Sequence, residues 1–415
     1  MGVSSILHAF FRAILNQETM LDISLSQRAQ SIKPSPTLAV TARAAELRAE
    51  GKDIIGLGAG EPDFDTPEHI KEAAIESLKK GQTKYTAVDG TVELKNAIID
   101  KFKRENNLEY NSNQILVSCG AKHSLFNLFQ AILNPGDEII IPAPYWVSYP
   151  DMAKLAGAEP VIIKTTINDQ FKITANKLRG AISDKTRLLV FNSPSNPSGV
   201  SYNEEELKAL GEVLLEFPDV LIVTDDIYEH ILWGQDKFVN IVNACPDLYD
   251  RTIVVNGVSK AYSMTGWRIG YVGGPESIIK GMKKIQSQST SNPSSMAQAA
   301  AVAALNGPQT YIEESTNIFK ERHDIVKSTL EEIDGITCIA SEGTFYCFPD
   351  MNGLIKKLDS ISNDIELAEF FLEKAEVAMV PGSAFGAPGC MRISFATSME
   401  NLEKSMERIK NALGS

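Results

Sequence analysis

The middle of the chain alternates short apolar runs with helical patterns, and this alternation constrains the fold more than any other feature. The runs are rich in β-branched and aromatic residues, and they are Gln114–Ser118, Glu138–Ile141, Val161–Ile163, Leu188–Phe191, Val220–Thr224 and Thr252–Val255. Runs of this kind are typical of strands buried on both faces of a largely parallel sheet. The pattern predicts a three-layer α/β domain with right-handed crossovers, over roughly residues 67–305.

The helical stretches between these runs have recognisable ends. Glu68–Lys80 follows Thr66-Pro67 and precedes Gly81, which predicts a helix with Pro at its first position and Gly after its end. Residues 121–133 form a second helical stretch, which stops at Asn134-Pro135-Gly136. Asn203–Phe217 has three glutamates in its first turn and Pro218 after its end.

A different pattern follows residue 305 and predicts a second, smaller α+β domain over 306–415. Its expected elements are a helix over Thr310–Ile333, the run Phe345–Phe348, a helix over Ile365–Glu376, a strand over Cys390–Phe395 and a helix from Met399. The segment before residue 67 has one helical pattern, Leu38–Glu50, which is too little for a core. We therefore expect residues 22–66 to form an arm and to pack on the second domain, which is then discontinuous.

Composition excludes several classes of function. The net charge of −13 argues against general affinity for nucleic acid or anionic lipid. Charges or prolines interrupt every apolar run, so no membrane span is predicted. Five scattered cysteines without metal-ligand spacing suit reduced thiols, and no metal site is expected. Residues 1–21 are interpreted as an extension upstream of an alternative start at Met20 rather than as a targeting segment, which favours a cytoplasmic location.

Ligands of open α/β sheets bind at the carboxyl ends of the strands, so the residues after each run indicate the site. Cys119–Lys122 is a small-residue turn that opens a helix and suits a phosphate, although a simple tight turn is the more common meaning. Trp146 and Asn196 lie in proline-rich turns after two further runs. Asp225 ends a buried run, where a carboxylate needs either a buried arginine or the protonated ring nitrogen of a cofactor.

The segment after the last run is Asn256–Gly270, and it contains Ser259-Lys260 with Gly-x-Arg ending at Arg268. This segment resembles the attachment signature for pyridoxal 5′-phosphate (PLP) in class I aminotransferases. Further matching segments occur in the right order, and the resemblance covers about residues 24–412. They are Leu57–Phe64, Lys84–Thr86, the Asn-Pro-x-Gly turn at 196–199, Asp225-x-x-Tyr228 and Met391–Phe395.

The resemblance implies fold type I of the PLP-dependent transferases and a role for each matching residue. Lys260 would hold PLP as a Schiff base and act as general acid and base. Asp225 would pair with the ring nitrogen, Tyr228 and Asn196 would bind the ring hydroxyl oxygen, and Trp146 would stack on the ring. The residues implied for the phosphate are Gly120, Ala121, Lys122, Ser259 and Arg268, with Tyr85 reaching in from a neighbouring subunit. The implied assembly is therefore a homodimer with shared active sites.

The implied substrates are amino acids and 2-oxo acids. Arg392 would bind the α-carboxylate, with help from Asn196, Trp146 and the Gly60 backbone. Lys122 lies where the class Ib subgroup, which includes bacterial aspartate aminotransferases, binds the distal carboxylate of acidic substrates; a lysine that only neutralises the phosphate is the alternative. Ala121–Pro150 and the phrase TGWRIGY also resemble that subgroup. The expected reaction moves the amino group of L-aspartate to 2-oxoglutarate by a ping-pong mechanism.

Other functions stay open at this point. Some relatives accept prephenate, whose extra carboxylate could use Lys33. A β-lyase or an alanine-type, kynurenine-type or aromatic aminotransferase would share the same fold. A non-catalytic PLP-binding regulator is disfavoured because no basic helix-turn-helix segment flanks the fold, and a nucleotide enzyme because no P-loop or GxGxxG is present.

Overall fold

The computed structural model describes residues 24–32, 34, 36–235 and 237–414. Within these residues the largest sheet has seven strands, parallel except for β8, which runs antiparallel to both neighbours. In their order across the sheet the strands are Ile115–Ser118 (β2), Gly270–Gly273 (β8), Thr252–Gly257 (β7), Leu221–Asp225 (β6), Thr186–Asn192 (β5), Glu138–Ala143 (β3) and Glu159–Lys164 (β4). The predicted, largely parallel sheet is confirmed, whereas β8 was not predicted.

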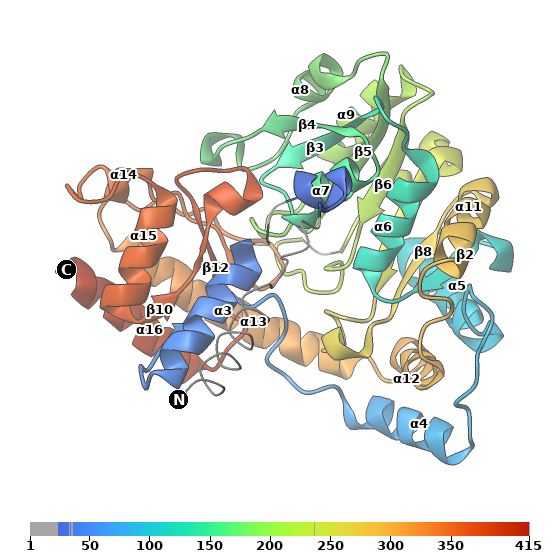
Figure 1. Ribbon diagram of the computed structural model, residues 1–415, viewed down its shortest axis with the longest axis horizontal. Coiled ribbons are helices and arrows are strands. Elements are labelled where there is room, and N and C mark those ends of the chain that lie inside the picture. Colours follow the sequence, from blue (N-terminus) through green and yellow to red (C-terminus); the bar gives the residue numbers. More distant parts are fainter. Residues whose placement is uncertain (1–23, 33, 35, 236, 415) are drawn as a thin grey trace, which may run out of the picture.

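The sheet is buried on both faces, which explains why its strands lack polar alternation. Ile140 and Leu189 belong to one hydrophobic cluster, while their neighbours Ile139 and Leu188 belong to another. Helices cover the two faces, and α6 packs against α11 while α4 and α5 pack against α12 (Figure 1). These helices are Glu68–Lys79 (α4), Val92–Asn106 (α5), Ala121–Ile132 (α6), Ser148–Leu155 (α7), Ala175–Ala181 (α8), Glu204–Leu215 (α9), Glu276–Ser287 (α11) and Ser295–Asn306 (α12).

Local signals in the sequence place the helix ends. Asn203 caps α9: its side chain accepts from the Glu206 backbone N–H, and the Glu206 carboxylate accepts from the Asn203 N–H. Pro67 precedes α4 at the N-cap position, one residue earlier than predicted, and Gly81 follows the helix with φ +70°. Within the described residues, no helix is both long and apolar enough to cross a membrane.

The elements after α12 form a smaller unit with its own hydrophobic cluster. Its short sheet has the order β11-β12-β9 and is antiparallel. The elements are Thr310–Glu331 (α13), Tyr346–Cys347 (β9), Asn352–Ile355 (α14), Asp364–Phe370 (α15), Val377–Ala378 (β10), Val380–Pro381 (β11), Met391–Ser394 (β12) and Met399–Leu413 (α16). The helix predicted over Ile365–Glu376 is α15 followed by a π-helical turn, Phe371–Ala375.

The segment before residue 67 packs on this smaller unit. Ile55–Gly56 (β1) pairs in parallel with β10, and the helix Pro36–Ala49 (α3) lies beside β10 and β11 (Figure 1). The short helix Gln27–Ser31 (α2) instead contacts α7 of the larger unit. The expected packing of the early segment on the late elements is thus present, while the boundaries at residues 22, 67 and 306 stay predictions.

Candidate active site

One cavity of about 820 Å³ lies where strands β5, β6 and β7 end. Asn192 ends β5, Asp225 ends β6, and Ser259 and Lys260 follow β7, and all four line the cavity. The smaller unit and the early segment close it with Arg392, Tyr346 and Gly60. Both units therefore contribute to the site, at the sheet edge where the sequence predicts it.

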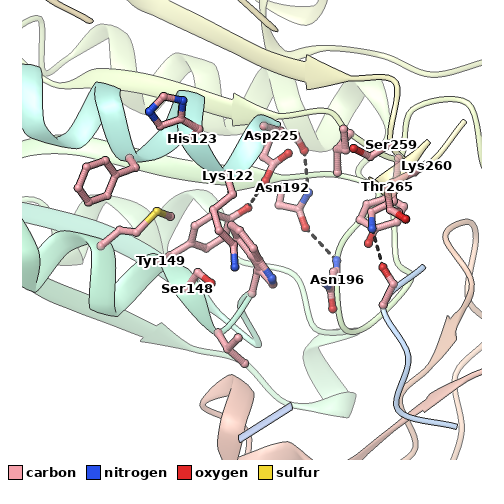
Figure 2. A pocket seen from close by; sticks show the side chains of 18 of the residues that line it. Lys122, His123, Ser148, Tyr149, Asn192, Asn196, Asp225, Ser259, Lys260 and Thr265 are labelled. Carbon is pink, nitrogen blue, oxygen red and sulfur yellow. Dashed lines mark hydrogen bonds between the residues drawn. The ribbon is translucent and has the colours of Figure 1, made fainter. Parts of the chain in front are cut away.

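Asp225 is fully buried and has half of its carboxylate satisfied. The Tyr149 hydroxyl donates to Oδ2 at 2.7 Å, whereas Oδ1 accepts from no side chain among the described residues (Figure 2). Burial raises the pKa of Asp225 to about 6, against the lowering influence of the Tyr149 hydrogen bond. Of the two partners expected from the sequence, no arginine reaches this carboxylate in the described part of the chain. Oδ1 is therefore a buried acceptor that the side chains of the described residues leave unsatisfied.

Lys260 extends into the same cavity and donates from Nζ to the Gly60 carbonyl at 2.5 Å (Figure 2). The aromatic rings of Tyr228 and Phe345 lie 6.0 and 5.8 Å from Nζ. Burial lowers the pKa of Lys260 to about 8, and the positive charges of Arg392 and Arg268 act in the same direction. About a tenth of this amine is therefore neutral, and hence nucleophilic, at pH 7, far more than for an ordinary lysine.

A cradle of N–H donors lies where helix α6 begins. Arg268 donates from Nη1 to the Thr265 carbonyl at 2.8 Å and from Nη2 to the Cys119 carbonyl at 3.2 Å, which fixes its guanidinium. Gly120 has φ +89°, and a Cβ there would stand 2.2 Å from Arg268 Nη2, so only glycine fits. The helix N-terminus, Ser259 and the guanidinium thus meet around one volume suited to a phosphate.

Arg392 is a buried cation whose recorded acceptors are neutral. Its Nη1 donates to Asn196 Oδ1 at 3.0 Å and its Nη2 donates to the Gly58 carbonyl at 2.8 Å, while its Nε has no partner within the described ranges. Asn196 is itself held by Asn192, whose Oδ1 accepts from the Asn196 N–H at 2.8 Å (Figure 2). A buried guanidinium without a carboxylate is costly, and a substrate carboxylate would offset that cost.

Lys122 is the second cation that faces the cavity. Its Nζ lies 4.8 Å from the centroid of the Trp146 ring, and Trp146 packs edge-on against Tyr149 at 5.3 Å. Burial lowers the pKa of Lys122, and the Arg268 charge acts in the same direction. Two cations from different units, Lys122 and Arg392, thus line one cavity.

Of the predicted site residues that the structure describes, all but Tyr85 lie at this cavity. Those that line the cavity are Gly60, Ala121, Lys122, Trp146, Asn196, Asp225, Tyr228, Ser259, Lys260, Arg268 and Arg392. Gly120 lies directly behind Arg268. Tyr85 does not line this cavity, and 91% of its surface is exposed. Lys33 lies outside the described residues.

The sequence reasoning missed two tyrosines of the cavity. Tyr149 lies in the quoted stretch Ala121–Pro150, but only tertiary folding shows that its hydroxyl reaches Asp225. Tyr346 lies in the predicted run Phe345–Phe348, and nothing local marks its hydroxyl as facing the cavity. The only signal in the sequence is indirect: a buried carboxylate such as Asp225 needs a hydrogen-bond donor, and Tyr149 supplies it.

A group of potential metal ligands lies elsewhere and is occupied by a lysine. Glu105, Glu229 and His230 have ligand atoms within 4.8 Å of one another. The buried ammonium of Lys101 is paired with Glu229 and lies 3.6 Å from Glu105. Asn256 and Asn106 also donate to Glu229, so this cluster ties α5 to the loop after β6.

The donor set of the cavity fits one kind of cofactor. A partly neutral lysine suits an aldehyde, a phosphate suits the Arg268 cradle, and the unpaired Oδ1 of Asp225 suits a protonated ring nitrogen. A mostly parallel α/β sheet whose strands end at these groups is the arrangement of a PLP-dependent enzyme.

Comparison with known proteins gives the family. Residues 52–409 match the model for aminotransferase class I and II, and the chain belongs to this family, whose cofactor is PLP. It is 60% identical to the aspartate/prephenate aminotransferase of Nitrosomonas europaea, over 94% of this chain and 100% of that protein. It is 51% identical to the aspartate aminotransferase of Bacillus subtilis, over 94% of this chain and 98% of that protein.

Solved structures of aspartate aminotransferases have the same fold as this chain. The crystal structure of an aspartate aminotransferase from Rhizobium meliloti superposes with a TM-score of 0.92 at 49% identity, covering 94% of this chain and 99% of that one. The aspartate aminotransferase from Thermus thermophilus with maleate gives a TM-score of 0.89 at 42% identity, covering 94% of this chain and all of that one. The resemblance to class I aminotransferases, and the fold that it implies, are confirmed.

Proposed function

We propose that this enzyme transfers the amino group of L-aspartate to 2-oxoglutarate, yielding oxaloacetate and L-glutamate in two half-reactions at one cavity. The observation that carries the proposal is the pair of cations, Lys122 and Arg392, that face this cavity from different units. Aspartate and 2-oxoglutarate each have two carboxylates, and one cavity must accept both in turn. Two relatives whose names include aspartate, at 60% and 51% identity, support the same substrate.

PLP, when bound, supplies an aldehyde that captures amines and a ring that withdraws electrons. Asp225 would hold the ring nitrogen, and Tyr228 with Asn196 would bind the ring hydroxyl oxygen. Trp146 would cover the ring face. The phosphate would lie against the turn Gly120–Lys122, Ser259 and the guanidinium of Arg268, where the helix N-terminus and the cation both favour negative charge.

Lys260 would be both the attachment residue and the base of the reaction. Its Nζ, with a pKa lowered to about 8, is a sufficiently strong base to take the α-proton of the substrate and is still partly neutral near pH 7. The Gly60 carbonyl, 2.5 Å away, accepts a hydrogen bond from this amine and orients it in the cavity. Lys260 therefore takes and returns one proton on Nζ in each half-reaction.

Arg392 would bind the substrate α-carboxylate with its two terminal nitrogens. Asn196 and Gly58 already hold the guanidinium, and Asn196 with the Gly60 backbone would complete the site. Lys122 would bind the distal carboxylate. Because both cations are desolvated, each carboxylate contact is worth roughly 1.5–3 kcal/mol, or about 10–100-fold in affinity.

Prephenate is the second candidate substrate. Its support is the name of the 60%-identical relative, an aspartate/prephenate aminotransferase. Prephenate has one carboxylate more than phenylalanine at its ring, so a further cation beside the cavity would favour it. Lys33 is the residue proposed for that contact on sequence grounds.

A homodimer in the cytoplasm is proposed as the working form. Tyr85 is 91% exposed, and Val92 and Leu78 nearby in the chain are apolar and also exposed. An assembly would cover these side chains and bring Tyr85 to the phosphate site of the partner subunit. Light scattering of the purified protein tests the stoichiometry. Mixing Lys260→Ala with Tyr85→Ala chains tests shared sites, because hybrid dimers would contain one intact site.

The absorption spectrum of the PLP-loaded protein tests the half-reaction. Adding aspartate alone should convert the band of the lysine-bound cofactor to that of the amine form, and Lys260→Ala should lack the first band. No such band in the wild-type protein would overturn the proposal. Steady-state rates with aspartate, glutamate, phenylalanine and prephenate test the substrate, and aspartate no better than phenylalanine would refute the preference for acidic substrates.

A further inference from the structure

Two tyrosine hydroxyls face each other at the cavity wall. The Oη atoms of Tyr228 and Tyr346 are 3.1 Å apart, and both residues are buried and line the cavity. Tyr228 comes from the loop after β6, and Tyr346 comes from β9 of the smaller unit. Hydrogen bonds from Ser341 Oγ to the Tyr346 carbonyl (2.7 Å) and from the Tyr346 N–H to Thr344 Oγ1 (3.2 Å) fix the backbone there.

Each phenol has a single proton, so the pair can share only one hydrogen bond. If Tyr228 donates to Tyr346, Tyr228 has no proton left for a ligand. If Tyr346 donates to Tyr228, the Tyr228 proton is free to point into the cavity. The direction of this bond therefore decides whether Tyr228 can donate to the cofactor.

The surroundings of the two phenols favour Tyr346 as the donor. The guanidinium carbon of Arg392 lies 4.4 Å from the centroid of the Tyr346 ring. Burial raises the pKa of Tyr346, and the Arg392 charge works against that rise. Burial also raises the pKa of Tyr228, the neighbouring Tyr346 adds to the rise, and Arg392 opposes it less prominently there. Because the guanidinium lies directly against the Tyr346 ring, its charge favours Tyr346 as the donor of the shared proton.

We propose that Tyr346 is a positioning residue, which donates to Tyr228 and thereby directs the Tyr228 proton at the ring hydroxyl oxygen of PLP. This inference rests on the role given to Tyr228 under the proposed function. A donor that itself accepts a hydrogen bond binds its acceptor more strongly. Tyr346 consequently strengthens the hold of Tyr228 on a developing negative charge at that oxygen, without touching it.

Tyr346→Phe isolates this effect, because phenylalanine keeps the ring under Arg392 and removes only the hydroxyl. The readout is the pH at which the absorption of the lysine-bound cofactor changes, which reports how firmly the ring oxygen is stabilised as an anion. A weakened Tyr228 bond leaves that oxygen more basic, so the midpoint should rise by about 0.3 pH unit. Tyr228→Phe should raise it further. In Tyr228→Phe the additional change Tyr346→Phe should then have no effect on the midpoint.

Tyr202→Phe is the matched control. Tyr202 is buried and its hydroxyl accepts from the Ile173 N–H at 2.7 Å, but it does not line this cavity. Its variant should leave the midpoint unchanged. In Tyr346→Phe the KM for aspartate should stay close to the wild-type value, since the ring keeps its contact with Arg392.

The outcomes separate this inference from the proposed function. A midpoint shift in Tyr228→Phe but none in Tyr346→Phe overturns the positioning role and leaves the function intact. The positioning role is also overturned if the midpoint shift of the double variant equals the sum of the shifts of the two single variants. Tyr346 would then act independently of Tyr228. No shift in either variant would remove Tyr228 from the cofactor site, and the proposed function would need revision first.

Discussion

The Tyr149 hydroxyl donates to Oδ2 of Asp225 at 2.7 Å, while Oδ1 accepts from no side chain in the described part of the chain. The protein thus holds one oxygen of the carboxylate that the proposed function assigns to the cofactor ring nitrogen. The arrangement orients the carboxylate before any ligand binds, and it has a cost, because an ionised carboxylate in this position is buried and only half satisfied.

That cost predicts a pH-dependent effect of Asp225→Asn on the cofactor-free protein. The pKa of Asp225 is about 6 in the folded state against 3.8 for the free group, so the folded state binds more protons than the unfolded one between these values. Stability from this group is therefore full below about pH 4 and is lost as the pH rises to 6. Asparagine avoids the loss, and Asp225→Asn should be more stable at pH 8 by about 3 kcal/mol. Urea unfolding at pH 4.5 and pH 8 measures the difference, and a variant less stable at both values would contradict it.

Lys260 should react with amine-acylating reagents at unusually low pH in the cofactor-free protein. Its pKa in the folded protein, about 8, lies well below 10.5, so its neutral amine forms at lower pH than that of surface lysines. Peptide mapping of acylation against pH should give a midpoint near 8 for this residue. Arg392→Gln should move the midpoint upward, because it removes a neighbouring positive charge. A midpoint near 10 in the wild-type protein would show that the amine is not desolvated.

Gly120→Ala should weaken PLP binding, whereas Gly136→Ala should not. Both glycines have φ near +90°, so both substitutions strain the backbone by roughly 1–3 kcal/mol. A Cβ at Gly120 would displace Arg268, while at Gly136 it meets nothing within 4 Å. The PLP dissociation constant should rise about 10–100-fold in the first variant, by loss of one charge-assisted contact. Equal affinities in the two variants would separate Arg268 from the phosphate.

Lys122→Met should lower kcat/KM for aspartate by about 10–100-fold and that for phenylalanine by much less. The reason is that only aspartate has a distal carboxylate for this cation. Lys154→Met, at an exposed position on α7, serves as the control. If kcat/KM falls equally for both substrates and the affinity for PLP also falls, Lys122 neutralises the phosphate instead of binding the distal carboxylate.

The sequence predicts the main part of the site because parallel strands end at a common edge. Asp225, Asn196 and Lys260 each follow a recognisable apolar run, so their proximity could be inferred without coordinates. The sequence does not predict strand β8, because Gly270–Gly273 is short and glycine-rich. Its antiparallel pairing depends on neighbours that are distant in the chain. Tyr149 and Tyr346 were missed because a hydroxyl partner across the cavity leaves no periodic or motif signal.

The hydrogen bond from Arg392 to the Gly58 carbonyl joins residues 334 positions apart. During synthesis the ribosome must therefore make nearly the whole polypeptide before Arg392 can form its hydrogen bond to the Gly58 carbonyl. The seven-stranded sheet, whose strands span residues 115–273, has all of its partners much earlier. A chain that ends before β12 therefore contains every strand of this sheet but lacks Arg392, so the Arg392–Gly58 contact is among the last that the growing chain can form.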